Sequence, residues 1–486
     1  MNIANTLSWV CSARVLLVLA AAIWLAAILS VGFDVRSHAI FRLLLSVLAL
    51  SLLFKTLRGR AGVLILSPVA ALALITLVFF SLLPAISFKW ADTFLTNPPT
   101  FETAAIYLGA TGEMIVLQTS AMLFALWAGL LDNFERRPVA GAPPYLHEKL
   151  VPWTTMVAIS LIFGSGIYLF SIMFWPPAAE FSQTVIGLLI KHVTQPLISI
   201  SVAALAYLAA TRRGIYGRIA LVAAMTAVAA LFTTVAAKAA VFISISCLLL
   251  YAMTMRFSLR QFAGVFGLIA ALLIAGVLIF QFMRTTPIIQ PSESIQQNIN
   301  QVLNSITAKL IFRQNVTGMC LQNVVDEHLD KPARNHPFYF AFAVVPRVLW
   351  PEKPSLSRGT EFAEEYCGFA RESGVSNDHS VTLMGEPIIE AGTVGLVTAQ
   401  AFLAILLVVV TVILLRNWPA GHIAMAALLP WLSDFDHNFA MYFANATKMF
   451  LIMLPFIGLL MFFDRKFRHA ASAESDGQSV SSRNMG

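Results

Sequence analysis

A short cationic segment interrupts an otherwise apolar chain. Between Val344 and Phe362 the sequence reads VVPRVLWPEKPSLSRGTEF, where Arg347, Lys353 and Arg358 stand among three prolines and a tryptophan. The planar guanidinium group of arginine holds two phosphate oxygens at once and never deprotonates, while lysine supplies a compact charge. Prolines fix the backbone φ angle and so restrict where these side chains lie. The pattern predicts a rigid cationic site for a phosphate-bearing ligand.

Other arginines of the same hydrophilic stretch are candidates for binding that ligand. Arg313 and Arg334 lie nearby in the sequence, and Arg284 follows directly on an apolar run. An arginine where a membrane helix ends lies at the height of phosphate groups. The alternative for each of these cations is an ion pair with an acidic residue of the loop, or a contact with lipid headgroups.

Groups that can accept a proton lie downstream of the cationic segment. A carboxylate or an imidazole can remove the proton of an attacking hydroxyl group, which makes Glu386, Glu390 and His379 candidates. Glu386 has an equally good alternative role, because an acidic side chain at a helix N-terminus complements the helix dipole. A lone loop histidine such as His379 is more commonly a polar surface residue.

The composition shows what kind of scaffold must position these residues. The chain has 486 residues, of which 58% are hydrophobic and 12% charged, whereas soluble domains carry about 25% charged residues. Runs of about 20 apolar residues, each long enough to cross a bilayer, recur along the chain. Uninterrupted apolar runs indicate helices and not barrel strands. We therefore expect an all-α, polytopic integral membrane helix bundle with about 12 transmembrane helices.

The apolar runs divide the chain into four parts. Residues 1–283 are expected to form an N-terminal transmembrane bundle of about nine spans, and residues 284–392 one large loop. Residues 393–465 are expected to hold about three more spans, and residues 466–486 a disordered tail. Six of the spans matter below; they are predicted at Pro152–Trp175, Thr184–Ala210, Arg218–Thr234, Thr393–Leu415, His422–Trp431 and Phe439–Phe463.

Lysine and arginine gather in alternate connections, which predicts the orientation of the chain. Examples are KTLRGR, TRRGIYGR and DRKFRH, whereas the other short connections hold few cations. Because basic connections stay in the cytoplasm, both termini are expected there and the loop 284–392 on the outer, in a bacterium periplasmic, face. The net charge of +7 is explained by these loop ends and not by nucleic-acid binding.

Two of the four cysteines fall in the large loop. An oxidising compartment would let Cys320 and Cys367 form a disulfide, although spacing alone leaves the pair equally open to being free. A metal site is less favoured, because neither a CxxC nor an HxxxH pattern accompanies them.

Two segments resemble a known enzyme family. VVPRVLWPEKPSLSRGTEFAEEY is similar to the proline-tryptophan segment of bacterial O-antigen and exopolysaccharide repeat-unit polymerases of the Wzy type. HSVTLMGEPIIEAGTVGLV resembles the same family's Gly-Glu segment, with matches at Gly385, Glu386, Gly392 and Gly395. A weaker similarity is the short turn AAKAAVF, where relatives usually carry arginine in place of Lys238. The resemblance covers about fifty residues.

This resemblance implies an activity that composition alone does not. Such polymerases transfer a growing glycan from undecaprenyl pyrophosphate onto a lipid-linked oligosaccharide repeat unit, with a large helical fold of the kind called GT-C-like. No metal and no other cofactor is expected, and a flippase and a chain-length regulator are partners by analogy, beside the lipid bilayer and the lipid-linked oligosaccharide. The residues expected to act in catalysis are Arg347, Arg358 and Glu386. Those expected to bind substrate are Arg284, Arg313, Arg334, Lys353, His379 and Lys238.

Three other functions compete with the polymerase. An O-antigen ligase moves a finished polymer from the same lipid and shares the topology, but the proline-tryptophan segment favours the polymerase. A transporter or flippase is the second alternative, although such proteins usually show paired repeats and broken helices near the midplane, and the sequence shows neither. The third is a non-catalytic assembly subunit that uses the loop as a docking surface.

Overall fold

The structure is a computed structural model, and it describes part of the chain. Its described residues are 44, 48, 67–69, 71–72, 146, 148–181, 184–212, 214–234, 243, 246–247, 250, 317, 319–345, 350, 352–354, 358–368, 380–415, 419–434 and 437–483. The remaining predicted spans, within residues 1–143 and 235–316, lie outside this set except for these isolated residues.

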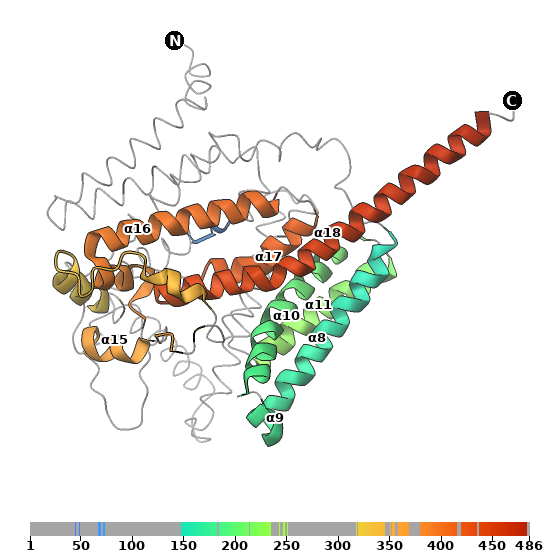
Figure 1. The fold of residues 1–486 in the computed structure, drawn as a ribbon. Coiled ribbons are helices and arrows are strands. Elements are labelled where there is room, and N and C mark those ends of the chain that lie inside the picture. The colour runs from blue at the N-terminus through green and yellow to red at the C-terminus, as the bar shows by residue number, and fades with distance from the viewer. Residues whose placement is uncertain are drawn as a thin grey trace, which may run out of the picture. The chain divides into compact units, whose positions relative to one another are not determined.

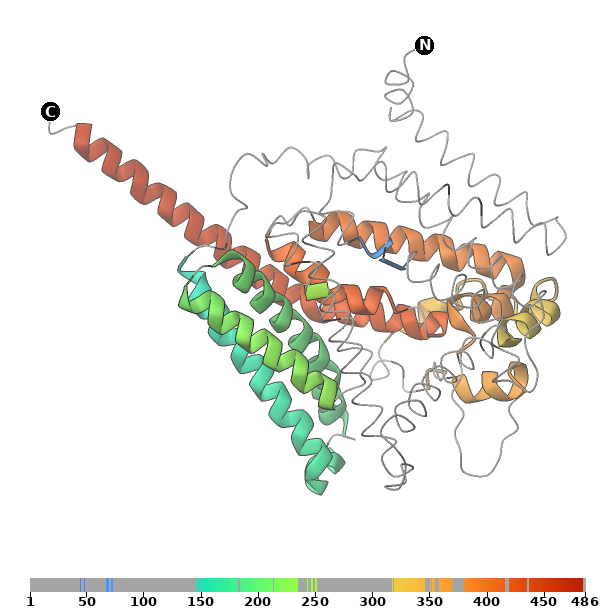
Figure 2. The same ribbon diagram turned by 180° about the vertical axis from the view of Figure 1, so that it is seen from behind.

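The described residues are mostly helical, with no strand among them (Figures 1 and 2). The α-helices are α8 (Leu150–Phe174), α9 (Pro176–Phe181), α10 (Val185–Thr211), α11 (Ile215–Thr234), α15 (Gly359–Tyr366), α16 (Thr382–Leu415), α17 (Ala420–Leu432) and α18 (Phe439–Arg483). A 3-10 helix, η5, spans Tyr339–Val344. The prediction of an all-α fold is confirmed for this part of the chain.

Three described helices are long and apolar enough to cross a membrane. These candidate spans are Leu150–Tyr168, Thr382–Leu415 and Phe439–Asp464. Shorter apolar helices occur at Pro196–Thr211, Ile215–Val228 and Ala420–Leu432. All six lie within or overlap a span predicted from the sequence, so the membrane character of the chain is supported, while the total of about twelve spans remains a prediction.

Prolines and polar caps set the ends of these helices. Helix α8 ends at Phe174, and Trp175, which precedes Pro176, adopts an extended conformation, as expected for a residue before proline. Helix α10 begins after Thr184, whose hydroxyl group accepts a hydrogen bond from the Gly187 backbone N–H at 3.1 Å. The chain thereby marks its own helix ends at these positions.

The chain forms two compact units that interleave along the sequence. One unit comprises Met1–Asn133, Ala275–Val412 and Trp431–Lys448, and the other comprises Phe134–Ile274, Ile413–Pro430 and Met449–Gly486. In the second unit, helices α8, α10 and α11 pack against one another. The Tyr168 hydroxyl group donates to the Gly187 carbonyl at 2.9 Å and links α8 to α10. The candidate site lies in the first unit.

A buried apolar cluster supports the loop region of the first unit. It joins a helical stretch at residues 319–328, helix α15 and the first turns of α16, and includes Leu321, Phe362 and Met384. The Asn323 amide donates to the Tyr366 carbonyl at 2.7 Å. Cys320 and Cys367, whose pairing the sequence left open, are bonded to each other at a sequence separation of 47. The described part of the loop is therefore packed and cross-linked.

Helix α16 contains a break that the sequence did not reveal. Ala391 and Gly392 have non-helical angles, and the Gly392 φ of 60° with ψ of −144° is a conformation that favours glycine. The break divides a short helix, Thr382–Glu390, from the long apolar helix that follows. The predicted span, which starts at Thr393, begins directly after the break.

The neighbouring loop satisfies the backbone groups that the break leaves open. The Ala333 N–H donates to the Ile389 carbonyl at 2.9 Å, and the Thr393 N–H donates to the Leu329 carbonyl at 3.1 Å. A Cβ atom on Gly392 would lie 2.5 Å from that same Leu329 carbonyl oxygen. Gly392 is therefore needed both for its φ angle and for the close approach of the loop.

Two further glycines of the same segment have a steric explanation. A Cβ atom on Gly395 would lie 2.1 Å from the Pro387 carbonyl oxygen, across the break. A Cβ atom on Gly385 would lie 2.8 Å from the Val381 Cβ. The three glycines that carry the family resemblance are thus positions at which the structure has no room for a side chain.

The C-terminal tail differs from its prediction. Residues from 466 onward were expected to be disordered, but α18 continues as one helix to Arg483 (Figure 1). The stretch HAASAESDGQSVSSR contains no proline and several residues that tolerate a helix. Extending an existing helix avoids the cost of nucleating a new one, which polar composition alone does not take into account.

We predict that Gly392→Ala destabilises the first unit. The backbone conformation alone costs about 1–3 kcal/mol for a residue with a Cβ atom, and the contact with the Leu329 carbonyl adds to this. Gly458→Ala in α18 is the matched control, because a Cβ atom there meets nothing within 4 Å. Denaturant unfolding in detergent micelles measures both; equal midpoints for the two variants would contradict the assigned break.

Candidate functional site

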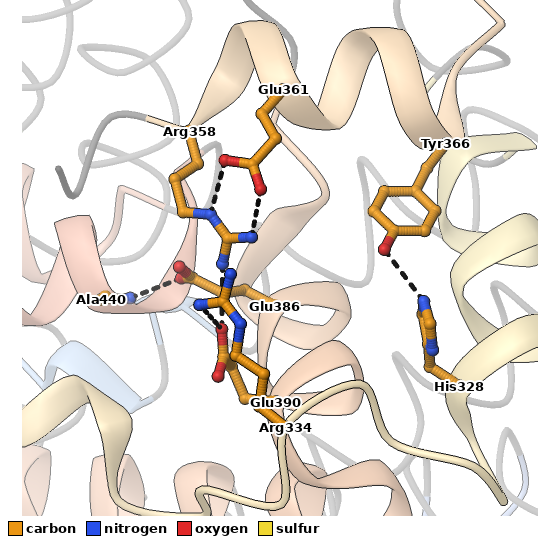
Figure 3. Close-up of polar contacts among 8 residues, drawn as sticks. All are labelled: His328, Arg334, Arg358, Glu361, Tyr366, Glu386, Glu390 and Ala440. Atoms are coloured by element: carbon orange, nitrogen blue, oxygen red, sulfur yellow. Dashed lines mark hydrogen bonds and ion pairs between the residues drawn. The ribbon is translucent and has the colours of Figure 1, made fainter. Parts of the chain in front are cut away.

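Arg358 ends the proline-rich segment and lies directly before α15. Its Nε donates to the Glu361 Oε2 at 2.9 Å and its Nη2 donates to the Glu361 Oε1 at 2.5 Å. Its third nitrogen, Nη1, donates to the Glu390 Oε1 at 2.9 Å. The guanidinium carbon lies 4.7 Å from the centre of the Phe362 ring. All three nitrogens are therefore held by carboxylate oxygens (Figure 3), and the Phe362 ring covers one face of the group.

Glu390 brings two arginines together. Its Oε1 accepts the bond from Arg358 and a second one from the Arg334 Nη1 at 3.3 Å. The Glu390 carbonyl also accepts a hydrogen bond from the His336 N–H at 2.8 Å. Glu390 is the last residue before the break in α16, so this single residue ties the loop and α15 to the end of the short helix.

Burial is unequal across this group of ion pairs. The Glu390 side chain is 3% exposed and that of Arg358 is 13% exposed. The Glu361 side chain is 49% exposed and that of Arg334 is 52% exposed. The inner pair is shielded from solvent, and each of its members has one outer partner of opposite charge that reaches solvent.

The charges of this group stabilise one another. The hydrogen bonds to Glu361, ahead of the charges of Glu361 and Glu390, raise the pKa of Arg358 above its ordinary value despite partial burial. The same hydrogen bonds lower the pKa of Glu361 below that of an ordinary carboxyl group. Both groups therefore remain charged at neutral pH, and the ion pair between them persists.

Glu386 lies one helical turn before Glu390 and is also buried, with 2% exposure. Its Oε2 accepts a hydrogen bond from the Ala440 N–H at 2.8 Å. Ala440 is the second residue of α18, so the carboxylate satisfies a backbone donor that has no partner within its own helix. The sequence allowed Glu386 a role at a helix N-terminus, and the structure places that contact at α18.

Tyr339, which the sequence did not single out as chemical, lies near the two carboxyl groups. Burial, followed by the charges of Glu386 and Glu390, raises the pKa of Tyr339 well above its ordinary value. Its buried hydroxyl oxygen forms no well-aligned hydrogen bond with the described residues. A protonated phenol in this position is a hydrogen-bond donor that a ligand oxygen could use.

Lys353 is engaged by its own loop. The side chain is buried, and its Nζ donates to the Ala343 carbonyl at 2.7 Å and to the Val345 carbonyl at 2.8 Å. These carbonyls end η5, so the ammonium group caps this helix as a cation should. The described contacts of Lys353 position the segment before Arg358.

His328 and Tyr366 form a second polar pair beside the arginine group (Figure 3). The His328 Nε2 lies 2.9 Å from the Tyr366 hydroxyl oxygen, and the two rings meet edge to face at 5.5 Å. Tyr366 belongs to the apolar cluster, next to the bonded Cys367. This pair fixes the C-terminal end of α15, while Arg358 is held at the other end.

The structure brings together part of the predicted site. Arg334, Arg358, Glu386 and Glu390 meet in one place, although they come from three segments of the chain. Lys353 is described but bonds to its own loop. The remaining residues predicted to act are Arg347, Arg284, Arg313, His379 and Lys238, and they lie outside the described residues. Among the residues that the structure describes, no three His, Cys, Asp or Glu side chains gather as a metal site would require.

Comparisons with known proteins add no identity. No protein-family model, no curated protein and no solved structure matches the chain. The function must therefore be argued from the residues of the site.

We predict that Glu386→Gln and Glu386→Ala differ in stability. Glutamine retains an acceptor oxygen for the Ala440 N–H, so its cost is limited to the lost charge at the helix end, about 0.3–1 kcal/mol. Alanine leaves that N–H without its partner, which costs about 1–3 kcal/mol more. Thermal unfolding of the purified variants measures the difference. Equal thermal midpoints for the two variants would show that the hydrogen bond from the Ala440 N–H contributes little to stability.

Proposed function

We propose that the chain is a polysaccharide polymerase, a glycosyltransferase that moves a growing glycan from undecaprenyl pyrophosphate onto a lipid-linked repeat unit. The observation that supports this most is the meeting of Arg358 and Arg334 on Glu390, one turn from the buried Glu386. These residues come from, or lie beside, the two segments that resemble the polymerase family. A site combining fixed guanidinium groups with a carboxyl group suits departure of a diphosphate and removal of a proton.

The proposed step is a substitution at the anomeric carbon of the donor glycan. The bond from this carbon to the diphosphate oxygen breaks, and undecaprenyl diphosphate leaves with the electron pair. A hydroxyl oxygen of the acceptor repeat unit forms the new glycosidic bond, and its proton passes to a basic group. Negative charge grows on the departing oxygen, which is the charge that the protein must stabilise.

Arg358 is the residue proposed to stabilise this charge. It is shielded, its position is fixed by the surrounding contacts, and its pKa is raised, so it remains a cation throughout. A preorganised donor of this kind needs little reorganisation when charge develops. Arg334 is the more exposed of the two and is proposed to bind the same diphosphate from the solvent side.

Glu386 is proposed to accept the proton. Glu390 is less suited, because its Oε1 already accepts hydrogen bonds from two guanidinium groups. The bond from Ala440 uses the Oε2 of Glu386, and we assign the proton to the other oxygen. Tyr339 is proposed to orient the Glu386 carboxyl group and the sugar oxygen beside it, since its buried hydroxyl group lies next to Glu386.

The setting of this reaction follows from the sequence. We propose a GT-C-like bundle of about twelve spans in a bacterial inner membrane, with both termini in the cytoplasm and the loop 284–392 in the periplasm. The donor and acceptor are both lipid-linked, so both reach the site from the outer leaflet. A flippase that supplies the repeat unit and a chain-length regulator are partners that this reaction would need.

We predict that Arg358→Lys lowers polymerisation by about a hundredfold or more, because lysine keeps the charge but cannot make the paired contacts of a guanidinium group. The assay reconstitutes the full chain in liposomes with a lipid-linked oligosaccharide and follows the glycan ladder, without nucleotide and with a chelator present. Arg218→Lys is the matched control, since Arg218 is exposed on α11.

Two results of this assay would count against the proposal. Full activity of both Arg358→Lys and Arg334→Lys would mean that the arginines are structural. A wild-type chain that forms no ladder, but attaches a preformed polymer to a lipid A core acceptor, would be a ligase. Thermal unfolding midpoints identify any variant that is inactive because it is unfolded.

We predict that Glu386→Gln reduces turnover by about 10²–10⁴-fold, the usual contribution of a general base. Because glutamine preserves the acceptor for Ala440, the thermal midpoint should change little while the ladder disappears. Binding of the donor lipid should be retained, since the proton is removed only in the transition state. Retained turnover would assign the carboxyl group to the α18 contact alone.

A further inference from the structure

The guanidinium group of Arg358 has two different hydrogen-bonding edges. The edge formed by Nε and Nη2 makes two parallel bonds to the two oxygens of Glu361, at 2.9 and 2.5 Å. The remaining nitrogen, Nη1, makes one bond to Glu390 at 2.9 Å. The paired edge is the one that a phosphate group would take, because two of its oxygens match the spacing of the two donors.

We infer that this edge is an exchangeable anion site, in which the Glu361 carboxylate stands in for the ligand and is displaced by an incoming diphosphate. The inference rests on the proposed function, because it concerns the same site and says that Glu361 occupies it before the donor lipid binds. Glu390 stays bound throughout and holds the guanidinium group in place while its outer partner changes.

The unequal burial of the two carboxylates determines which one can leave. Glu361 is 49% exposed, whereas Glu390 is 3% exposed. Glu390 is also bonded by Arg334 through its side chain and by His336 through its carbonyl. Among the described residues, both hydrogen bonds of the Glu361 carboxylate come from Arg358, and its side chain lies on the solvent side of α15. It can therefore rotate into water, where a carboxylate is well solvated.

The Glu361 carboxylate stabilises Arg358 while no ligand is bound. A guanidinium group that is 13% exposed would be costly to leave without its outer counter-charge. Glu361 removes this cost when no ligand is present. It also raises the requirement on the ligand, because an anion that offers one oxygen cannot replace two bonds from a carboxylate on the same chain. The exchange thus selects ligands that offer two neighbouring oxygens and more than one negative charge, as a diphosphate does.

The test measures inorganic pyrophosphate binding to the full chain in detergent by isothermal titration calorimetry at constant ionic strength. Removing the internal competitor in Glu361→Gln should tighten pyrophosphate binding at least tenfold. Glu352→Gln is the charge-matched control, because Glu352 is exposed and its replacement removes the same charge elsewhere in the loop. This variant should bind pyrophosphate as tightly as the wild type does. Arg358→Lys should lose binding in both the wild-type and the Glu361→Gln backgrounds.

Each other outcome overturns the inference or separates it from the proposed function. If Glu361→Gln binds pyrophosphate no better than the wild type, or if Glu352→Gln gains as much, Glu361 is not a competitor. If both Glu361→Gln and Glu361→Ala fail to fold, the carboxylate is a fixed structural contact and the inference is wrong. Tighter binding by Glu361→Gln in a protein that forms no glycan ladder would uphold the exchange and remove the polymerase.

Discussion

The ion pair between Arg358 and Glu390 is the contact on which the site depends. Both side chains are shielded, and breaking such a pair by removing one partner costs about 3–5 kcal/mol, because a buried charge is left unpaired. The cost falls on several elements at once, since Glu390 also bonds to Arg334 and, through its carbonyl, to His336. The pair therefore fixes the guanidinium group and the loop fold together.

The break in α16 makes this arrangement possible. An unbroken helix would use its own N–H groups to satisfy the Ile389 and Glu390 carbonyls, and the loop would have no donors to match. At the break, these carbonyls accept bonds from Ala333 and His336 instead. The loop is thus held against the end of the short helix that carries Glu386 and Glu390. The glycines of this segment contribute to the site only indirectly, by allowing two backbones to approach.

The sequence predicted the helices better than the contacts between them. Apolar runs and prolines are local signals, and α8, α10 and α18 begin within two residues of their predicted starts. Arg358 and Glu386 were found because their residue types suit anion binding and proton transfer. Glu361 and Tyr339 were not, because a half-exposed glutamate and one tyrosine of an aromatic run carry no signal until folding places them beside charges. The break was not predicted, because the sequence assigned residues 382–392 to the loop and began the span at Thr393, so no helix was expected before it.

The electrostatics of the group also explain how charge can be concentrated in so apolar a chain. Two arginines and two glutamates, Glu361 and Glu390, alternate in sign along the contacts Arg334, Glu390, Arg358, Glu361, so the row is neutral at rest. A neutral row avoids the cost of isolated charges near hydrocarbon. It nevertheless holds two guanidinium groups on one carboxylate oxygen of Glu390, so an anion that replaced Glu361 would meet an Arg358 that is already oriented. The number of arginines matters less here than the order in which their counter-charges are buried.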